Sequence, residues 1–356
     1  MNKKVLIALI PLMFTFTSCG GNKSDTPKQK EYFTLWNISE SKALQRLIEY
    51  VNDVTNVFSP NYIPVEDRIA TFDMDGTFVG ELYPTYFEYN LLEYRALDDP
   101  DYKDIAPSDV VEAATDIRNF VRDNVPLPDH FDMKHAYAAA KAYSGMTLKE
   151  FDEYVKAYAK KEANGFEGMT YGESFYKPML EVFDYLKDYG FDYYVVSGSD
   201  RYICRSLVES IGIPMNKVIG MDVVIESSNQ GDEEGVNHTM KKDEYLIRTD
   251  ELIIKNLKTN KVKQISQEIG KVPVLSFGNS SGDQAMHNYC LGENQKYRSE
   301  AFMLVANDNL RDHADLEEGA SREKKWNDNG YQVIHMKEDF KTIYGYGVKC
   351  VPFHFE

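Results

Sequence analysis

The sequence feature that most restricts the fold is a short apolar run that ends in an acidic, glycine-containing turn. Residues 68–72 read Arg-Ile-Ala-Thr-Phe, and the next five residues are Asp73, Met74, Asp75, Gly76 and Thr77. A run of this length is typical of a buried strand in a parallel sheet. Because ligands of open α/β sheets bind at the carboxyl ends of the strands, this run also places two carboxylates where chemistry can occur.

The rest of the chain alternates between helix and strand patterns. An amphipathic helix is predicted over residues 39–57, with Ser39 or Ser41 as its cap. Beyond residue 176, helical patterns separate short apolar runs, and we predict strands at 191–196, 218–221, 272–277, 301–305 and 331–335. This alternation predicts an α/β protein with a Rossmann-like parallel sheet that is covered on both faces. We expect the core to comprise residues 31–85 and 176–356.

Two segments interrupt this alternation. Residues 86–175 show helical spacing and no convincing strand, which predicts a helical insertion after the first core strand. Residues 222–256 are expected to form irregular hairpin structure with a polar loop at 227–242.

The composition excludes several classes of function. The 356 residues carry a net charge of −17, so the chain should repel the phosphates of nucleic acids, and we expect no nucleic-acid partner. A small anionic substrate is still compatible, because a local pocket can be positive. Four scattered cysteines, Cys19, Cys204, Cys290 and Cys350, suit neither a disulfide scaffold nor a zinc site.

The first thirty residues look like an export signal and a tether. Two lysines precede the apolar run 5–16, and Thr17, Ser18 and Cys19 follow it. The end of this stretch resembles a bacterial lipoprotein cleavage box, which implies that residues 1–18 are removed and that Cys19 carries the lipid anchor. Residues 19–30 are then a flexible tether, and the mature protein is held at a membrane of the cell envelope. The alternative is a plain secretory signal with an accidental cysteine.

The turn after the first strand has the groups needed for phosphoryl chemistry. Of Asp73 and Asp75, one can act as a nucleophile and the other as a general acid and base, and both can hold Mg²⁺. The alternative is a solvated acidic turn. At the end of the next strand, Ser197 and Gly198 offer a hydroxyl and backbone N–H groups for phosphate oxygens, or else form a simple turn that caps a helix.

A third motif follows the later strand at 272–277. Asn279 and Asp283 offer oxygens four residues apart where a turn enters a helix. Before this strand, Lys261 and Lys263 lie at the start of a predicted helix, where a lysine could pair with a carboxylate nucleophile and with the charge of a phosphoryl group.

Taken in order, these motifs resemble the haloacid dehalogenase (HAD) superfamily, on its phosphatase branch. The resemblance covers about residues 36–350 and is strongest with bacterial phosphoserine-phosphatase-like hydrolases. It implies that Asp73 attacks phosphorus to form an aspartyl-phosphate and that Asp75 is the acid and base. Ser197, Gly198 and Thr77 would bind the phosphoryl group. Lys261 would neutralise charge, with Lys263 as the alternative.

The resemblance also implies a bound Mg²⁺. Its ligands would be Asp73, the carbonyl of Asp75 and Asn279, with Asp283 acting directly or through water. Many family members have aspartate where Asn279 stands. Asparagine keeps an oxygen ligand but removes one negative charge, so metal affinity could be weaker than usual.

In the family, an insertion such as 86–175 is a cap that closes over the site. Glu81 matches the stretch in which a glutamate of phosphoserine phosphatases meets the amino group of the substrate. Its alternative is a flap residue that bonds to the backbone. The aromatic side chains between Tyr83 and Tyr94 are expected to pack between the cap and the core.

These observations predict a Mg²⁺-dependent phosphomonoester hydrolase for a small phosphorylated metabolite, one that carries an amino or ammonium group if Glu81 binds it. Two alternatives are a lipoprotein binding module that has lost turnover and a phosphotransferase. Asn279 is the residue that favours the binding module, whereas the presence of Asp73, Asp75 and Lys261 argues against it.

Overall fold

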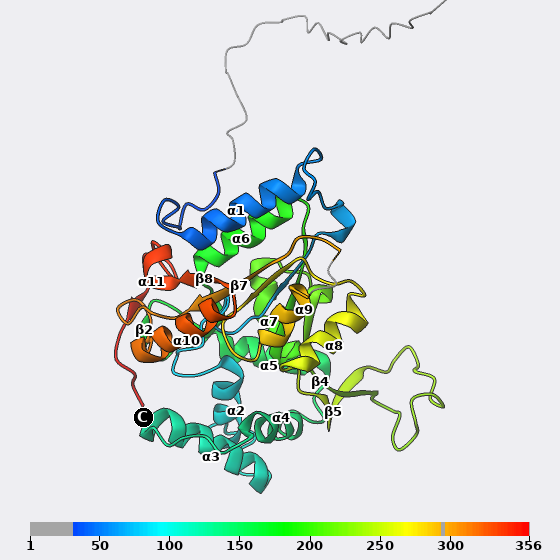
Figure 1. Cartoon of the computed structure of the whole chain (residues 1–356). Coiled ribbons are helices and arrows are strands. Elements are labelled where there is room, and N and C mark those ends of the chain that lie inside the picture. The colour runs from blue at the N-terminus through cyan, green and yellow to red at the C-terminus, as the bar shows by residue number, and fades with distance from the viewer. Residues whose placement is uncertain (1–30, 293–295, 356) are drawn as a thin grey trace, which may run out of the picture. The chain divides into compact units, whose positions relative to one another are not determined.

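A seven-stranded sheet forms the centre of the compact unit Phe33–Glu356 (Figure 1). The structure is a computed structural model, and it describes residues 31–292 and 296–355. The predicted signal peptide 1–18, the tether 19–30 and the anchor Cys19 lie outside the described residues.

The strand order is β5-β4-β3-β1-β6-β7-β8, and every neighbouring pair is parallel except β4 and β5. The strands are β1 (Ile69–Phe72), β3 (Asp192–Asp200), β4 (Val218–Ser227), β5 (Leu246–Ile254), β6 (Leu275–Gly278), β7 (Glu300–Val305) and β8 (Gln332–His335). The predicted α/β class with a mostly parallel sheet is confirmed. The acidic turn leaves the central strand β1, so the neighbouring strands β3 and β6 end beside it.

An aromatic ladder covers one face of this sheet. Phe72 of β1 stacks on Phe277 of β6, and Phe277 stacks on Phe302 of β7, with ring centroids 4.3 and 4.9 Å apart. Phe183 of helix α6 (Lys177–Asp188) packs on Phe72 at 4.3 Å. Helix α1 (Lys42–Thr55) lies on the same side, and Ser41 caps it by accepting a hydrogen bond from the N–H of Leu44.

The other face packs against helices that follow β5, β6 and β7. Ile265 of α8 and Met286 of α9 join Val196 of β3 and Ile219 of β4 in one apolar cluster. Trp326 of α10 packs on the alternate side chains of β7. The helices of this layer are α8 (Thr259–Glu268), α9 (Gln284–Cys290) and α10 (Leu316–Asp328).

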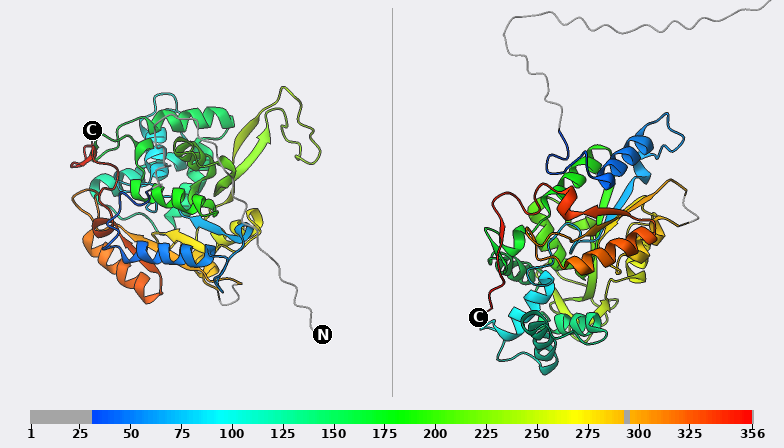
Figure 2. Two further views of the ribbon diagram at one scale, coloured as in Figure 1. Left: turned by 90° about the horizontal axis from the view of Figure 1, so that it is seen from above. Right: turned by 60° about the vertical axis from the view of Figure 1, so that its left-hand side comes forward.

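Four helices lie within residues 86–175, as the helical pattern predicts. They are α2 (Phe87–Leu97), α3 (Ser108–Asp123), α4 (Phe131–Ala142) and α5 (Leu148–Ala159). Figures 1 and 2 show α2, α3 and α4 gathered outside the sheet, and α5 contacts α7 (Arg201–Val208). These helices form the insertion layer. The same stretch also contains one two-residue strand that the sequence pattern did not predict, β2 (Phe166–Glu167), which pairs antiparallel with β9 (Lys349–Cys350).

The hairpin expected at 222–256 is present, and its strands are longer than the sequence pattern indicated. Strand β4 continues to Ser227, and β5 pairs with it in an antiparallel ladder whose register shifts at two points. The insertion layer stabilises β5 from its other edge, because Arg248 exchanges backbone hydrogen bonds of 2.8 and 2.9 Å with Gly145 and Met146. These partners are distant in sequence, so local patterning could not show them.

Within the described ranges, no helix has the length and apolar character needed to cross a bilayer.

Candidate active site

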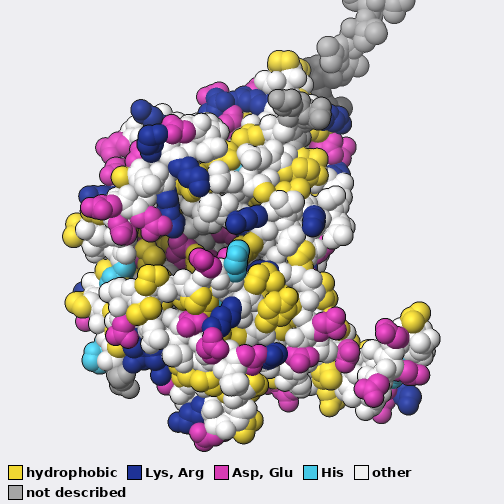
Figure 3. Space-filling view, turned by 60° about the horizontal axis from the view of Figure 1, so that its bottom comes forward, with side chains coloured by type: hydrophobic (Ala, Val, Ile, Leu, Met, Phe, Trp, Pro, Cys, Tyr) yellow, Lys and Arg dark blue, Asp and Glu magenta, His cyan; other side chains and the backbone are white. Residues whose placement is uncertain are grey.

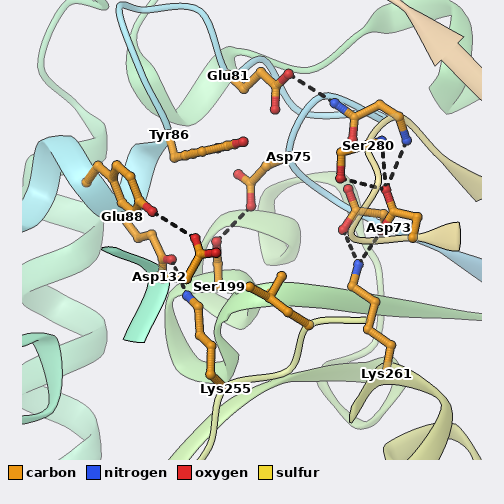
Figure 4. Close-up of a pocket in the computed structure, with 15 residues that line it drawn as sticks. Asp73, Asp75, Glu81, Tyr86, Glu88, Asp132, Ser199, Lys255, Lys261 and Ser280 are labelled. Atoms are coloured by element: carbon orange, nitrogen blue, oxygen red, sulfur yellow. Dashed lines mark hydrogen bonds and ion pairs between the residues drawn. The ribbon is translucent and has the colours of Figure 1, made fainter. Parts of the chain in front are cut away.

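A pocket opens where β1, β3 and β6 end and where the insertion layer faces the sheet (Figure 4). Its lining comes from distant parts of the chain: Asp73, Asp75, Glu81, Tyr86, Glu88, Tyr89, Asp132, Gly198, Ser199, Lys255, Leu257, Lys261, Asn279, Ser280 and Asp283. Seven of the nine predicted site residues in the described chain line it, whereas Thr77 and Ser197 lie just behind its wall. The face that carries the insertion layer is hollowed, with acidic side chains in the hollow (Figure 3).

Lys261 is the charged centre of the pocket. Its ammonium nitrogen lies 2.5 Å from Oδ1 of Asp73 and 2.7 Å from Oδ1 of Asp283, and all three side chains are buried. Burial disfavours a charged amine, yet the two carboxylates raise the pKa of Lys261 above its ordinary value, so it stays protonated. Lys263, the alternative lysine, lies exposed on the same helix.

The Asp73 carboxylate is held from two sides. Lys261 holds Oδ1, and the hydroxyl of Thr77 donates to Oδ2 at 3.2 Å. Burial, together with the nearby Asp283 carboxylate, raises the pKa of Asp73 to about 7, and the Lys261 ammonium opposes this shift. Thr77 therefore contacts the predicted nucleophile itself and does not line the pocket.

Asp75 has one oxygen bound and one free. Its Oδ2 accepts from the hydroxyl of Ser199 at 2.7 Å and from that of Ser197 at 3.5 Å. Its Oδ1 is buried and has no hydrogen-bond partner among the described residues. Burial raises the pKa of Asp75 to about 7, although the Ser199 hydrogen bond opposes the shift. A carboxyl group that is partly protonated near neutral pH can serve as a general acid.

Ser199 is a site residue that the sequence analysis missed. Ser197 is fully buried, and its hydroxyl accepts the N–H of Ser199, while Ser199 lines the pocket. The apolar pattern predicts a strand that ends at Val196, whereas β3 runs to Asp200. Side chains two residues apart on a strand share a face, so a strand through 200 would have indicated Ser199.

Asp283 uses both carboxylate oxygens within the protein. Oδ1 pairs with Lys261, and Oδ2 accepts from the backbone N–H groups of Asn279 and Ser280 at 3.1 and 3.0 Å. The Lys261 ammonium lowers the pKa of Asp283 although burial opposes the shift. This geometry favours a role in positioning the lysine and the turn, and the predicted role in metal binding stays a prediction.

Glu81 contacts a predicted metal ligand. Its Oε1 accepts from the side-chain amide of Asn279 at 3.0 Å, and Nη1 of Arg322 lies 4.0 Å away. Burial raises the pKa of Glu81 to about 7, although the positive charge of Arg322 opposes the shift. The contact is made with a side chain, whereas the alternative was that Glu81 bonds to the backbone.

A second buried ion pair links the insertion layer to the core. Glu88 of α2 accepts from the ammonium of Lys255 at 2.9 Å and from the backbone N–H of Asp200 at 3.1 Å. Asp200 also pairs with Arg248 of β5 at 2.6 Å. Sequence patterns do not indicate this network, because its members come from separate elements.

Two tyrosines of the insertion layer line the pocket as well as packing. Tyr86 and Tyr89 meet edge to face at 5.2 Å, and the hydroxyl of Tyr89 donates to Asp132 at 3.3 Å (Figure 4). Both tyrosines were expected only to pack between the insertion and the core, whereas in the structure they also line the pocket.

The donor set at the pocket suits a hard divalent cation. Asp73 supplies a carboxylate, Asp75 a main-chain carbonyl and Asn279 a carboxamide, and oxygen donors of this kind are what Mg²⁺ prefers. In the described chain, no three His, Cys, Asp or Glu side chains are grouped as a metal site. The predicted set needs no such group, because two of its three oxygens come from a backbone carbonyl and an amide.

Of the three comparisons with known proteins, the comparison with solved structures found similar proteins. No family model matches the sequence, and the curated proteins contain no match. One similar structure is a conserved protein of unknown function from Anaerococcus prevotii DSM 20548, at 15% identity and TM-score 0.49, covering 86% of this chain and 94% of that one. Cytosolic 5'-nucleotidase IIIB bound to cytidine shows 12% identity and TM-score 0.49 over 85% and 88% of the chains.

A phosphoserine phosphohydrolase-like protein from Francisella tularensis subsp. tularensis SCHU S4 shows 15% identity and TM-score 0.41 over 75% of this chain and 94% of that one. Other structural neighbours are described as hydrolases, one of them as a HAD family hydrolase. At these identities and scores, the assignment of a function depends on the residues of this chain.

Removal of the Lys261 ammonium should destabilise the fold. Lys261→Met leaves the buried carboxylates of Asp73 and Asp283 without their cation, which costs about 3–5 kcal/mol of unfolding free energy. Urea unfolding at neutral pH measures the change. Lys263→Met makes the same substitution at an exposed position of α8 and should stay within about 0.5 kcal/mol of wild type. Equal stability of the two variants would contradict the role of the pair.

Proposed function

We propose that this protein is a Mg²⁺-dependent phosphomonoester hydrolase that works through an aspartyl-phosphate on Asp73. The observation that carries the proposal is the pairing of two differently held carboxylates in one pocket. Asp73 is bound by Lys261 and Thr77, whereas Asp75 keeps one buried oxygen free. Hydrolysis of a phosphate ester through a covalent intermediate needs both a nucleophile and an acid, and these two carboxylates support the proposal because they could fill the two roles.

In the first step, a carboxylate oxygen of Asp73 attacks phosphorus and the bond from phosphorus to the ester oxygen breaks. Asp75 gives its proton to the departing alkoxide, so the alcohol leaves neutral. The Lys261 ammonium and backbone N–H groups near Gly198 offset the charge on the phosphoryl oxygens. Mg²⁺ held by Asp73, the Asp75 carbonyl and Asn279 would add positive charge at the same oxygens.

In the second step, Asp75 is ionised and takes a proton from water. The water oxygen attacks phosphorus, and the bond to Asp73 breaks. Inorganic phosphate leaves and both aspartates return to their starting states. Side chains of the insertion layer form part of the pocket lining, where they would limit the entry of other water.

The far side of the pocket suits a small alcohol that bears an amino or ammonium group. Tyr86 and Tyr89 present ring surfaces, and Asp132 adds an exposed carboxylate that accepts a hydrogen bond from Tyr89. Aromatic faces beside a carboxylate attract cations. Phosphoethanolamine, phosphocholine and phosphoserine are therefore the substrates to compare.

Loss of the nucleophile should abolish turnover. Phosphate release from p-nitrophenyl phosphate and the three ammonium-bearing esters is measured with Mg²⁺ and with EDTA. Asp73→Asn should lower the rate by at least about 10³-fold, and EDTA should remove the activity of the wild type. A wild type that binds these esters without turnover would indicate a binding lipoprotein. Alcohol release that exceeds phosphate release in the presence of a second alcohol would indicate a phosphotransferase.

The acid role of Asp75 predicts a pH dependence. Because the pKa of Asp75 is raised to about 7, the protonated form that serves a poor leaving group is lost as the pH rises through 7. Ionisation of Asp73, whose pKa is also raised to about 7, affects both kinds of substrate alike. The ratio of alkyl phosphate turnover to p-nitrophenyl phosphate turnover should therefore fall between about pH 6 and 8, because p-nitrophenolate leaves without a proton. Parallel profiles for the two substrate types would contradict this role.

We also propose that the protein is held at a membrane of the cell envelope through lipid on Cys19. The support is the sequence at residues 3–19. Mass spectrometry of the N-terminal peptide from membrane fractions should show an acylated Cys19 with residues 1–18 removed. Cys19→Ala should move the protein out of the membrane fraction. An unmodified cysteine within an intact or differently cleaved N-terminus would contradict the anchor.

A further inference from the structure

The side chain of Asn279 is fixed by one partner. Its amide nitrogen donates to Oε1 of Glu81 at 3.0 Å, and both side chains are buried, with 4% and 8% of their surfaces exposed. A side-chain amide has donors on nitrogen and an acceptor on oxygen, so its orientation decides which of them a cation meets. Holding the nitrogen at Glu81 leaves the oxygen of Asn279 available to a cation.

Gly76 leaves room for the hydrogen bond between Glu81 and Asn279 because it has no side chain. Gly76 has a φ of +73°, and a Cβ atom placed there would lie 1.9 Å from the amide nitrogen of Asn279 and 2.6 Å from the Glu81 carboxylate. Both the positive φ and the close approach require glycine. The Glu81–Asn279 pair therefore lies directly over the backbone that follows Asp75, whose carbonyl is a predicted Mg²⁺ ligand.

The charge of Glu81 is only partly balanced by the protein. Nη1 of Arg322 lies 4.0 Å from Oε1 of Glu81, while Nη2 of the same guanidinium pairs more closely with Glu318 at 2.6 Å. When it is ionised, Glu81 supplies a buried negative charge one hydrogen bond away from Asn279. That charge is what an asparagine lacks when it takes the place of an aspartate.

We propose that Glu81 and Asn279 act together as a metal-binding unit, in which Glu81 orients the amide oxygen toward Mg²⁺ and provides the negative charge that Asn279 lacks. Glu81 is then a positioning residue for the metal and is not the group that recognises a substrate ammonium. This inference rests on the Mg²⁺ site of the proposed function.

The test measures Mg²⁺ binding without turnover. Isothermal titration calorimetry with MgCl₂ alone is applied to full-length protein purified in detergent. Glu81→Gln should weaken Mg²⁺ binding by about tenfold, as expected when a partner of a metal ligand is lost. Glu318→Gln is the matched control: it removes a carboxylate from the same arginine without touching Asn279, and it should change the affinity less than about twofold.

The double variant Glu81→Gln/Asn279→Asp moves the charge across the hydrogen bond and should restore the affinity to within about threefold of wild type. At saturating Mg²⁺, Glu81→Gln should leave the ratio of KM values for phosphoethanolamine and p-nitrophenyl phosphate unchanged. Unchanged Mg²⁺ affinity in Glu81→Gln, together with a raised KM for phosphoethanolamine alone, would overturn the inference and assign Glu81 to the substrate.

If Glu81→Gln does not fold, Asn279→Asp alone decides the question. It places two carboxylates in direct contact, so its Tm without Mg²⁺ should fall and its rise on adding Mg²⁺ should exceed that of wild type. A Tm and a Mg²⁺ affinity equal to those of wild type would overturn the inference. Failure of the proposed function is a separate result, namely no phosphate release that depends on Asp73 although Mg²⁺ binds.

Discussion

A single ammonium group, Nζ of Lys261, joins the ends of three elements. It lies between Asp73, which follows β1, and Asp283, which precedes α9, and it comes from α8. Neither carboxylate could remain ionised in this buried position without a cation. Asp283 in turn holds the backbone of the turn that carries Asn279. The positions of the predicted nucleophile, the predicted metal ligand and the lysine therefore depend on one another.

A second network connects this site to the insertion layer. Glu88 of α2 binds the N–H group that follows Ser199, and the Ser199 hydroxyl binds Asp75. Arg248 of β5 joins this network through its ion pair with Asp200. Because a buried polar group is costly without its partners, displacement of the insertion layer would also disturb the hydrogen bond to Asp75. The insertion layer and the predicted acid, Asp75, thus belong to one hydrogen-bonded system.

Sequence patterns predicted the parts of the molecule that depend on local order. The strands β1, β6, β7 and β8, the helical insertion and the turn at Asp73 all follow from apolar spacing and turn composition. The full length of the β4–β5 hairpin was missed because its support comes from Gly145 and Met146 in the insertion layer. Ser199 was missed because the polar end of β3 does not look like a strand. Lys255 and Glu88 were missed because they meet only through the fold.

By itself, the sequence determined the α/β class, the central strand and the identities of the groups that can do phosphoryl chemistry, because apolar periodicity and side-chain chemistry are local properties. Only the tertiary structure decided which lysine enters the site, that Ser199 binds Asp75 and that Glu81 binds Asn279. Those choices depend on which side chains are buried against one another. Burial sets the cost of an unpaired charge, and it is a property of the packed chain and not of any one segment.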